Sequence, residues 1–295
     1  MLTELRTFIC VVELNNFTRA AEKLALSQPS VSMHIKNLED EFGTTLIQRG
    51  LKKKNIHITP AGEILYSTAK QITKLIENTK ADLKSYAHEL DGTLHIGASF
   101  TIGEYFLPGI LGVFSRMYPK LKLQVSIDNT ENICRKLENL QIDIGLIEGE
   151  PPADIFDAQS FYRDNLVLIT ARDQALSKAV FVTKNWQNQV WITREVGSAS
   201  RKQLDDFLLT NKLQVSNLTL FSSNFAIKEA VKNNLGVALL SEYIALDAQK
   251  KKEISIVSMH QEYFRNFNYL LPKGIKATRA AQSFIEHLQN TYPCI

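Results

Sequence analysis

Three patterns of hydrophobic and polar positions follow one another along this 295-residue chain. Up to about residue 58, apolar residues recur every three or four positions, which predicts short amphipathic helices. From Pro60 to about Leu90 the spacing alternates between four and three, which is a heptad pattern. Beyond Thr93, short apolar runs alternate with helical patterns, which predicts an α/β domain. We therefore expect three parts: residues 1–58, residues 59–91 and residues 92–295.

In the first part, a polar turn separates two helical segments, and the second of them has two distinct faces. Ser27 is placed to cap this second helix, and Pro29 fits only its first turn. One face must be buried, because it carries at helical spacing Val31, Ile35, Leu38 and Phe42. The opposite face carries Pro29, Met33, Lys36 and Asn37. A helix-turn-helix of this kind places its second helix in the major groove of DNA, whereas a small helical bundle with a polar outer helix is the alternative.

The stretch after this helix predicts a strand at 46–49, a basic loop at 50–55 and a second strand at 56–58. Its cations are Arg49, Lys52, Lys53 and Lys54. A run of charge on its own is often only a solvated surface. Beside a helix-turn-helix, however, four cations within six residues favour contact with DNA phosphates, which makes binding depend on salt.

Residues 5–62 as a whole resemble the winged helix-turn-helix of LysR-type transcriptional regulators. The matching residues are Leu5, Phe8, Ala20, Ala21, Leu24, Ser27, Gln28, Val31, Ser32, Ile35, Leu38, Glu39, Gly43, Leu46, Arg49, Thr59, Pro60, Ala61 and Gly62. The resemblance implies binding to double-stranded DNA at a pseudo-palindromic operator. We expect the DNA contacts to be made by Thr18, Arg19, Gln28, Pro29, Ser30, Ser32, Met33, Lys36, Arg49, Lys52, Lys53 and Lys54.

The chain departs from this family pattern at two positions of the second helix. The family commonly has Arg where this chain has Met33, and Gln where it has His34. Methionine cannot make the bidentate contact to guanine that arginine makes, so base preference at this position is expected to differ. The loop between the two short strands is also about two residues longer than in the family.

The heptad stretch predicts one long helix, because Thr59 can cap it and Pro60 can open it. An apolar stripe along so long a helix needs a partner, either elsewhere in the same chain or in a second subunit. The resemblance favours a second subunit with antiparallel helices, and it implies a homodimer that assembles further into a tetramer. The expected dimer contacts are Leu65, Ala69, Ile72, Ile76 and Leu83.

The third part is expected to be α/β with mostly parallel sheets. Strands are predicted at 94–98, 121–127, 142–147, 166–170, 190–193 and 218–221, and helices at 107–118, 130–140, 201–209, 225–233 and 278–288. This order resembles the two-lobed effector domain of LysR-type regulators, which shares its fold with periplasmic solute-binding proteins. By that resemblance, lobe one comprises 92–161 and 268–295, and lobe two comprises 162–267.

Three loops that follow predicted strands carry hydroxyl groups at the starts of helices, where ligands bind in open α/β sheets. Helix N-termini and a guanidinium suit a small carboxylate or inorganic oxyanion, although each hydroxyl could simply cap its helix. A carboxylate nearby would repel an anion, so an amino acid whose ammonium faces that carboxylate is the alternative. The expected effector-binding residues are Ser99, Phe100, Thr101, Glu148, Ser198, Ser200, Arg201 and Ser223.

Other classes of function find little support in the residues. There is no G-x-S-x-G elbow, no Walker A loop and no G-x-G-x-x-G motif, so we do not expect an enzyme. The six histidines and three cysteines show no metal-ligand spacing, so no metal or other cofactor is expected. No apolar run approaches a membrane span, and Glu4, Arg6 and Glu13 interrupt the apolar residues at the start, so a cytoplasmic protein is expected.

The net charge of only +3 means that the case for DNA depends on where the charges lie and not on their sum. The function expected from the sequence is a transcriptional regulator that binds DNA and responds to a small effector between two lobes. RNA polymerase is a further partner that this function allows. An architectural DNA-binding protein that needs no ligand is the alternative.

Overall fold

The computed structural model describes the whole chain except residues 50–55, 86–89, 152–154, 175, 177–179 and 293–295. The chain divides into two compact units, Met1–Ala87 and His88–Ile295, which are described separately below. The long helix belongs to the first unit. No helix among the described residues is long and apolar enough to cross a membrane.

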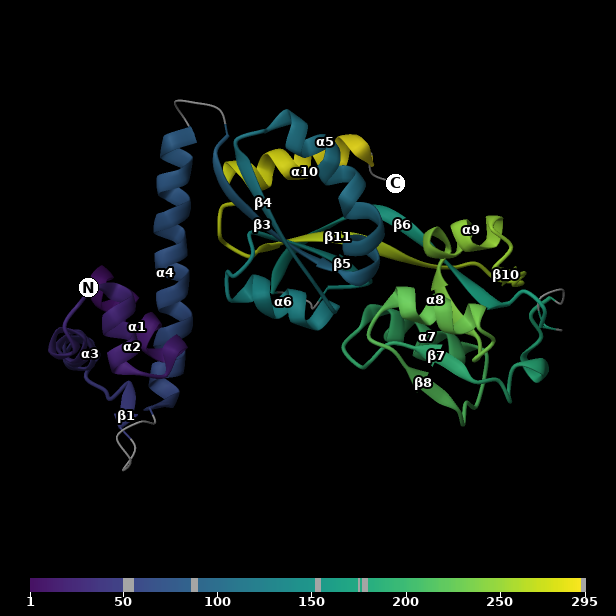
Figure 1. The fold of residues 1–295 in the computed structure, drawn as a ribbon, viewed down its shortest axis with the longest axis horizontal. Coiled ribbons are helices and arrows are strands. Elements are labelled where there is room, and N and C mark those ends of the chain that lie inside the picture. The colour runs from purple at the N-terminus through teal and green to yellow at the C-terminus, as the bar shows by residue number, and fades with distance from the viewer. Residues whose placement is uncertain (50–55, 86–89, 152–154, 175, 177–179, 293–295) are drawn as a thin grey trace. The chain divides into compact units, whose positions relative to one another are not determined.

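The first unit is a winged helix-turn-helix followed by a long helix (Figure 1). Its elements are α1 (Leu2–Leu14), α2 (Phe17–Leu24), α3 (Gln28–Phe42), β1 (Ile47–Arg49), β2 (Ile56–Ile58) and α4 (Pro60–Ser85). The two strands are antiparallel, with Ile47 opposite Ile58. The N-terminal fold is therefore the predicted one.

Local chemistry explains where α3 begins and ends. The hydroxyl of Ser27 accepts a hydrogen bond from the backbone N–H of Ser30 at 3.1 Å, which caps the first turn. Gly43 ends the helix with a left-handed φ of 61°. Val31, Ile35 and Leu38 are buried as predicted. Phe42 is 47% exposed, contrary to the prediction, because the apolar face continues to the last residue of the helix, beyond the core.

The start of α4 is fixed to the wing through one threonine. The Thr59 hydroxyl donates to the carbonyl of Thr45 at 2.7 Å and accepts from the backbone N–H of Gly62 at 3.0 Å. From there the helix packs on its own domain, where Leu65 and Ala69 belong to the core of the first unit. The prediction that these two residues contact a second subunit is therefore wrong, and for them the alternative of packing within the chain holds.

The second unit is an α/β structure with two lobes. Its elements are β3 (Gly92–Ser99), η1 (Ile102–Phe106), α5 (Leu107–Met117), β4 (Leu121–Asp128), α6 (Thr130–Glu138), β5 (Ile144–Glu148), β6 (Phe156–Ala171), η3 (Thr183–Asn185), β7 (Trp191–Thr193), α7 (Ala199–Thr210), β8 (Leu218–Leu220), α8 (Asn224–Lys232), β9 (Ala238–Ser241), α9 (Glu242–Lys250), β10 (Ile254–Val257), β11 (Tyr263–Pro272) and α10 (Arg279–Thr291).

The main sheet is mixed, which corrects the prediction of mostly parallel sheets. Its strand order is β10–β6–β11–β5–β3–β4, and β9 also pairs with β6. Only β3 with β4 and β3 with β5 are parallel in it, whereas β6 and β11 pair antiparallel with each other and with their other neighbours. The small sheet of β7 and β8 is parallel. The reason is that two long strands return through the middle of the sheet instead of crossing over by a helix.

These two long strands, β6 and β11, also join the lobes (Figure 1). In lobe one, α5 and α10 cover one face of the sheet and α6 covers the other (Figure 1). Lobe two contains α7, α8, α9 and the β7–β8 sheet, and its core contains two fully buried tryptophans, Trp186 and Trp191. Because β6 and β11 both run from one lobe into the other, the residues in the middle of these strands lie between the two lobes.

Candidate DNA interface and effector cleft

The outer face of α3 is open in the structure. Met33 is 56% exposed, and Pro29 and Lys36 are exposed beside it. The Ser27 and Ser30 hydroxyls lie 2.7 Å apart, and the Gln28 amide donates to the Ser32 hydroxyl at 3.3 Å. The polar groups of this helix therefore form a continuous surface that can contact base edges and phosphates. On α2, Thr18 and Arg19 are also exposed.

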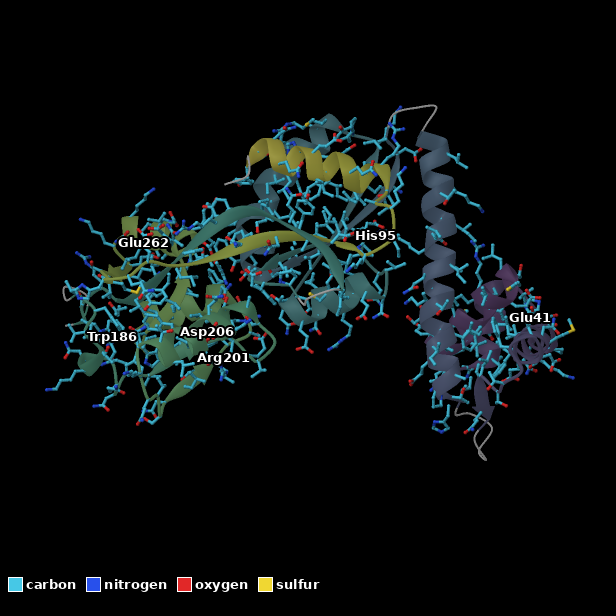
Figure 2. The ribbon with its side chains drawn as sticks, turned by 180° about the vertical axis from the view of Figure 1, so that it is seen from behind. Glu41, His95, Trp186, Arg201, Asp206 and Glu262 are labelled. Carbon is cyan, nitrogen blue, oxygen red and sulfur yellow. The ribbon has the colours of Figure 1, made fainter. Side chains whose placement is uncertain are left out.

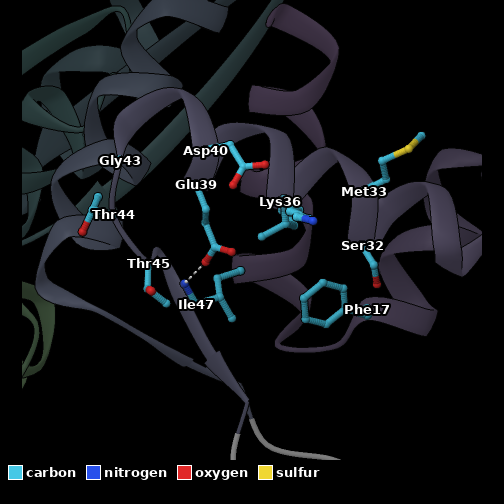
Figure 3. Close-up of a pocket in the computed structure, with 11 residues that line it drawn as sticks. Phe17, Ser32, Met33, Lys36, Glu39, Asp40, Gly43, Thr44, Thr45 and Ile47 are labelled. Atoms are coloured by element: carbon cyan, nitrogen blue, oxygen red, sulfur yellow. Dashed lines mark hydrogen bonds between the residues drawn. The ribbon is translucent and has the colours of Figure 1, made fainter.

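A groove separates α3 from the start of the wing and has a volume of about 880 Å³ (Figure 3). Ser32, Met33 and Lys36 line it from the helix, and Thr44 and Thr45 line it from the loop that follows. The Glu39 carboxylate, also in the lining, accepts hydrogen bonds from the backbone N–H groups of Leu46 at 2.8 Å and Ile47 at 3.2 Å. The recognition helix and the first wing strand are thus held to each other.

His34 has a role inside the domain that the sequence did not reveal. Its Nδ1 lies 2.9 Å from the Thr7 hydroxyl of α1. That hydroxyl already donates to the carbonyl of Thr3, also at 2.9 Å, so it accepts from the histidine ring. His34 therefore helps to fix α3 on α1, and its neighbour Met33 faces solvent.

The basic loop of the wing lies outside the described residues. This applies to Lys52, Lys53 and Lys54, and also to the side chain of Arg49, whose backbone ends β1. Their contacts with DNA stay predictions from the sequence.

The later part of α4 keeps an apolar surface uncovered in this unit. Ile72 is exposed, Ile76 is half-buried, and Leu83 is 70% exposed. Ile64 and Leu75 are exposed apolar residues on the same helix that the heptad pattern did not include. The exposed apolar face is therefore broader than the predicted seam, and it is available to a second subunit.

The three hydroxyl-bearing loops of the second unit do meet, around a residue that the sequence analysis did not select. Arg265 of β11 donates from Nη2 to the Thr101 hydroxyl at 3.0 Å and from Nη1 to the Ser200 hydroxyl at 3.2 Å. The Asn224 amide, at the start of α8, donates to the same Thr101 hydroxyl at 2.9 Å. The predicted convergence is thus present, with a buried arginine at its centre.

Two buried carboxylates complete this cluster. Glu148 lies 2.5 Å from Nη1 of Arg265 and accepts from the backbone N–H of Thr101 at 2.7 Å. Asp164 accepts from Nε of Arg265 at 2.9 Å and from the Ser241 hydroxyl at 2.6 Å. Burial raises the pKa of Asp164, although Arg265 opposes that shift. The helix start at Thr101, one of the places expected to hold an anion, is therefore occupied by Glu148.

Phe100 and Ser99 lie beside this cluster in different settings. The Arg194 guanidinium stacks over the Phe100 ring at 4.0 Å and forms two hydrogen bonds with Glu195. Ser99 is buried, and its hydroxyl has no hydrogen-bond partner among the described residues. Burial also raises the pKa of the nearby Glu104, with Arg194 acting in the opposite direction. The segment before Thr101 thus carries an unsatisfied buried hydroxyl and a ring on which a cation stacks.

The remaining predicted residues lie at the starts of α7 and α8. Ser223 caps α8, because its hydroxyl accepts from the backbone N–H of Ala226 at 3.4 Å. Ser198 stands at the N-cap of α7 but makes no capping hydrogen bond, and it is buried. Arg201 forms an ion pair with Asp205, in which both carboxylate oxygens accept from its Nε. Its charge is thus already compensated, which the sequence prediction did not include.

Ser198 and Arg201 line a pocket of about 390 Å³ between the lobes. Thr130, Glu148 and Gly149 line it from lobe one, and α7 lines it from lobe two, with Arg201 and Asp206 near each other in Figure 2. The hydroxyl of Thr130 is buried without a partner among the described residues. The site can therefore accept a small polar molecule at the N-terminus of α7. No cluster of potential metal ligands occurs within the described residues.

Four residues of this region did not stand out in the sequence: Arg265, Asp164, Asn224 and Arg194. One signal was available: a charged residue within an otherwise apolar strand pattern is expensive to bury unless it is paired. Arg265 lies two residues before Phe267, and Asp164 lies two residues before Leu166, so each is a charge within such a strand pattern. Their pairing with each other could not be read from the sequence, since they are 101 residues apart.

Comparisons with known proteins agree with this architecture. Residues 2–63 match the family of bacterial regulatory helix-turn-helix proteins, lysR family, and residues 87–293 match the LysR substrate binding domain. The HTH-type transcriptional regulator CysL of Bacillus subtilis is 41% identical over 291 residues, which cover 98% of this chain and 96% of that protein.

Two solved structures extend the comparison to the fold. A full-length OxyR variant from Pseudomonas aeruginosa matches 98% of this chain and 94% of its own, with a TM-score of 0.76 at 22% identity. The CcmR regulatory domain of Synechocystis, solved in complex with 2-PG, matches 69% of this chain and 98% of its own, with a TM-score of 0.62 at 24% identity. With both family domains matched in order along the chain, this protein belongs to the LysR family of DNA-binding transcriptional regulators and is not an enzyme.

Proposed function

We propose that this regulator binds a pseudo-palindromic operator as a dimer and that a small anionic effector, bound between the lobes of its second unit, changes that binding. The observation that carries the effector proposal is the N-terminus of α7. Its N-cap residue Ser198 is buried, makes no capping hydrogen bond, and faces a pocket of about 390 Å³. Backbone N–H groups at such an end favour negative charge.

The DNA arm of the proposal uses the outer face of α3. The first turns of α3 enter the major groove in a helix-turn-helix, and they carry Pro29, Ser32 and Met33. On α2, Thr18 and Arg19 are placed to contact the phosphate backbone of the DNA. A two-fold dimer presents two such helices, which requires two half-sites related by symmetry. We infer that the subunits pair through the exposed part of α4, and that dimers associate further as tetramers.

The charges around the pocket decide which effector is favoured. Glu148 would repel an anion, but its charge faces Arg265, which lies 2.5 Å away. Arg201 is paired with Asp205 yet lines the pocket, so it can turn from this exposed partner to a ligand at small cost. A carboxylate or an inorganic oxyanion then gains both the guanidinium and the helix N-terminus.

An amino acid is the second candidate, and one observation favours it. Glu150 and Asp206 also line the pocket, and among the described residues Lys202 is the only cation in its lining besides Arg201. A ligand with an ammonium group would place it near these carboxylates while its own carboxylate meets α7. The two candidates differ in net charge, so one screen separates them.

The experiment is a thermal-unfolding screen of the purified protein with sulfate, phosphate, acetate, succinate and a set of amino acids. A ligand at 100 times its dissociation constant stabilises the folded state by about 2.7 kcal/mol. We expect an anion to do so, and we expect Arg201→Ala to lose most of the effect. The matched control is Arg172→Ala, an exposed arginine outside the pocket, which keeps it.

Three results would count against the proposal. Equal stabilisation of the native and Arg201→Ala proteins would place the anion elsewhere. Stabilisation by amino acids alone would favour the second candidate. No stabilisation by any compound, with operator binding intact, would favour a DNA-binding protein that works without a ligand.

A further inference from the structure

One guanidinium, that of Arg265, lies where the two lobes meet and makes no contact with bulk water. Its side chain is 1% exposed. It has five N–H donors, and four acceptors are assigned to them: Asp164 to Nε, Glu148 and Ser200 to Nη1, and Thr101 to Nη2. So many partners on one side chain fix the positions of both the arginine and its neighbours.

The four partners come from both lobes. Glu148 ends β5 and Thr101 precedes η1, so both belong to lobe one. Ser200 lies in the first turn of α7, in lobe two. Asp164 and Arg265 lie on β6 and β11, the two strands that join the lobes. The guanidinium is therefore bonded to both lobes and also to the two strands that join them.

The charges of the cluster depend on each other. One buried cation faces two buried carboxylates, and removal of the cation leaves Glu148 and Asp164 with no opposite charge in contact. Such a loss is strongly unfavourable at a buried site. A lysine keeps the charge but has a single nitrogen, so it cannot reach Glu148, Asp164 and both hydroxyls at once.

We propose that Arg265 is the positioning residue of the effector response: it couples the two lobes by bonding Glu148 and Thr101 of lobe one and Ser200 of lobe two. Because Glu148 also lines the pocket between the lobes, a ligand in that pocket acts on the lobe arrangement. The coupling is a property of the ligand-free protein. Its link to an effector rests on the function proposed above.

The first test is hydrogen–deuterium exchange of the full chain without ligand. In Arg265→Gln we expect exchange to rise at least about tenfold in two segments, residues 99–106 of lobe one and 198–204 of lobe two. The matched control is Arg163→Gln, because Arg163 is next to Asp164 on β6 but is exposed and pairs with the surface residue Glu262. The control should leave both segments as in the native protein.

An increase confined to lobe two, or equal increases in Arg163→Gln and Arg265→Gln, would overturn the proposal. Arg265→Lys provides a second variant if Arg265→Gln does not fold. It keeps one ion pair, so we expect partial protection of both segments. Protection equal to that of the native protein would mean that charge alone suffices and that the fork geometry does not matter.

The second test separates this role from simple packing, and it uses pH. The titratable and charged groups that face the cluster are Glu148 of β5, Asp164 of β6, Glu104 of η1 and Arg194 beyond β7. Without the guanidinium, its opposing effect on Asp164 is lost and burial raises the pKa of Asp164 further. The folded state of the variant therefore gains stability as Asp164 takes up a proton at falling pH. The difference in Tm between native and Arg265→Gln should be largest near pH 8 and shrink toward pH 5.

A deficit in Tm that does not change with pH would indicate lost packing and would overturn the electrostatic part. Charge can also be removed from all three groups in the variant Arg265→Gln, Glu148→Gln, Asp164→Asn. This triple variant should recover much of the Tm yet keep fast exchange in both segments. Because none of these measurements includes a ligand, they can succeed while the anion screen fails, and the reverse.

Discussion

The DNA-binding face of α3 and the cleft of the second unit are both lined with polar side chains, but they satisfy them differently. On α3 these groups lie within ten residues of one another and stay exposed, as Gln28 and Lys36 show. In the cleft they are buried and bonded to each other across as many as 164 residues of sequence, as in the pair Thr101 and Arg265. The polar groups on α3 are exposed to solvent and can bind a partner, whereas the polar groups of the cleft are mostly hydrogen-bonded to one another.

This difference predicts two kinds of response to mutation. A change on an exposed face alters an affinity and leaves the free energy of unfolding nearly unchanged. A change inside the bonded cluster alters stability first, and its effects are not additive, because its members share partners. The predictions below test this contrast, in order of decreasing effect.

The largest effect is expected from Ile76→Asp in the exposed part of α4. A carboxylate at a helix–helix seam should separate the subunits while each monomer stays folded. Operator affinity should fall by about a hundredfold or more, since each half-site then loses the effective concentration that its partner supplies. Sedimentation and a DNA-binding titration measure the two parts.

The matched control for this change is Ser67→Asp on the same helix, about 180° around from Ile76 at 100° per residue. It adds the same charge off the seam and should leave the dimer intact. An intact dimer in Ile76→Asp would show that α4 does not mediate the pairing.

A smaller effect, on specificity and not on assembly, is expected from Met33→Arg. Arginine can bond both acceptors of a guanine in the major groove, which is worth about 1–3 kcal/mol of discrimination against other bases. A selection from random DNA should therefore return a motif with a new guanine in each half-site.

Glu41→Arg is the control, because it adds positive charge to the last turns of the same helix. It should strengthen binding to all sequences alike. If Met33→Arg and the native protein select the same motif, residue 33 does not face the bases.

The smallest effect compares two serines that the sequence treats alike. Ser223→Ala should lower the free energy of unfolding by about 1 kcal/mol, because it removes the cap of α8. Ser198→Ala removes no capping bond, so its unfolding free energy should change by less than about 0.5 kcal/mol. Only Ser198→Ala should weaken the stabilisation that an anion provides. Denaturant titrations measure the unfolding free energies, and a larger loss in Ser198→Ala than in Ser223→Ala would mean that Ser198 is the cap and Ser223 is not.

The parts of the fold that the sequence predicted are those encoded by local spacing. The caps at Ser27 and Thr59, and the buried positions Val31 and Ile35, follow from residues within one or two turns. The first half of β6, together with β9, α9, β10 and β11, did not follow. Residues 156–160 of β6 are mostly exposed and do not alternate clearly between apolar and polar, so only their pairing with β11 makes them a strand.

The candidate site divides in the same way. Thr101 and Ser200 were selected from the sequence because each stands at the start of a helix after a strand, and in the structure both hydroxyls bond the same guanidinium. Their partner Arg265 comes from a strand that was not predicted, and its role exists only through contacts of long sequence separation. The burial of Leu65 and Ala69 depends likewise on how the first turns of α4 pack on the core of their own domain. The heptad spacing predicts an apolar stripe but cannot tell packing within the chain from packing on a second subunit.

The bonds that Glu39 and Thr59 make to the wing have a mechanical consequence. Glu39 holds the N–H of Leu46, and the Thr59 hydroxyl reaches the carbonyl of the same residue at 3.2 Å. At Gly62 a Cβ atom would lie 2.2 Å from that carbonyl, so this approach requires glycine. These bonds fix α3, the start of β1 and the first turn of α4 to one another, so they move as one rigid body. In the dimer proposed above, two such bodies joined along α4 would hold their α3 helices at a fixed distance, and the proposed operator must supply half-sites at that distance.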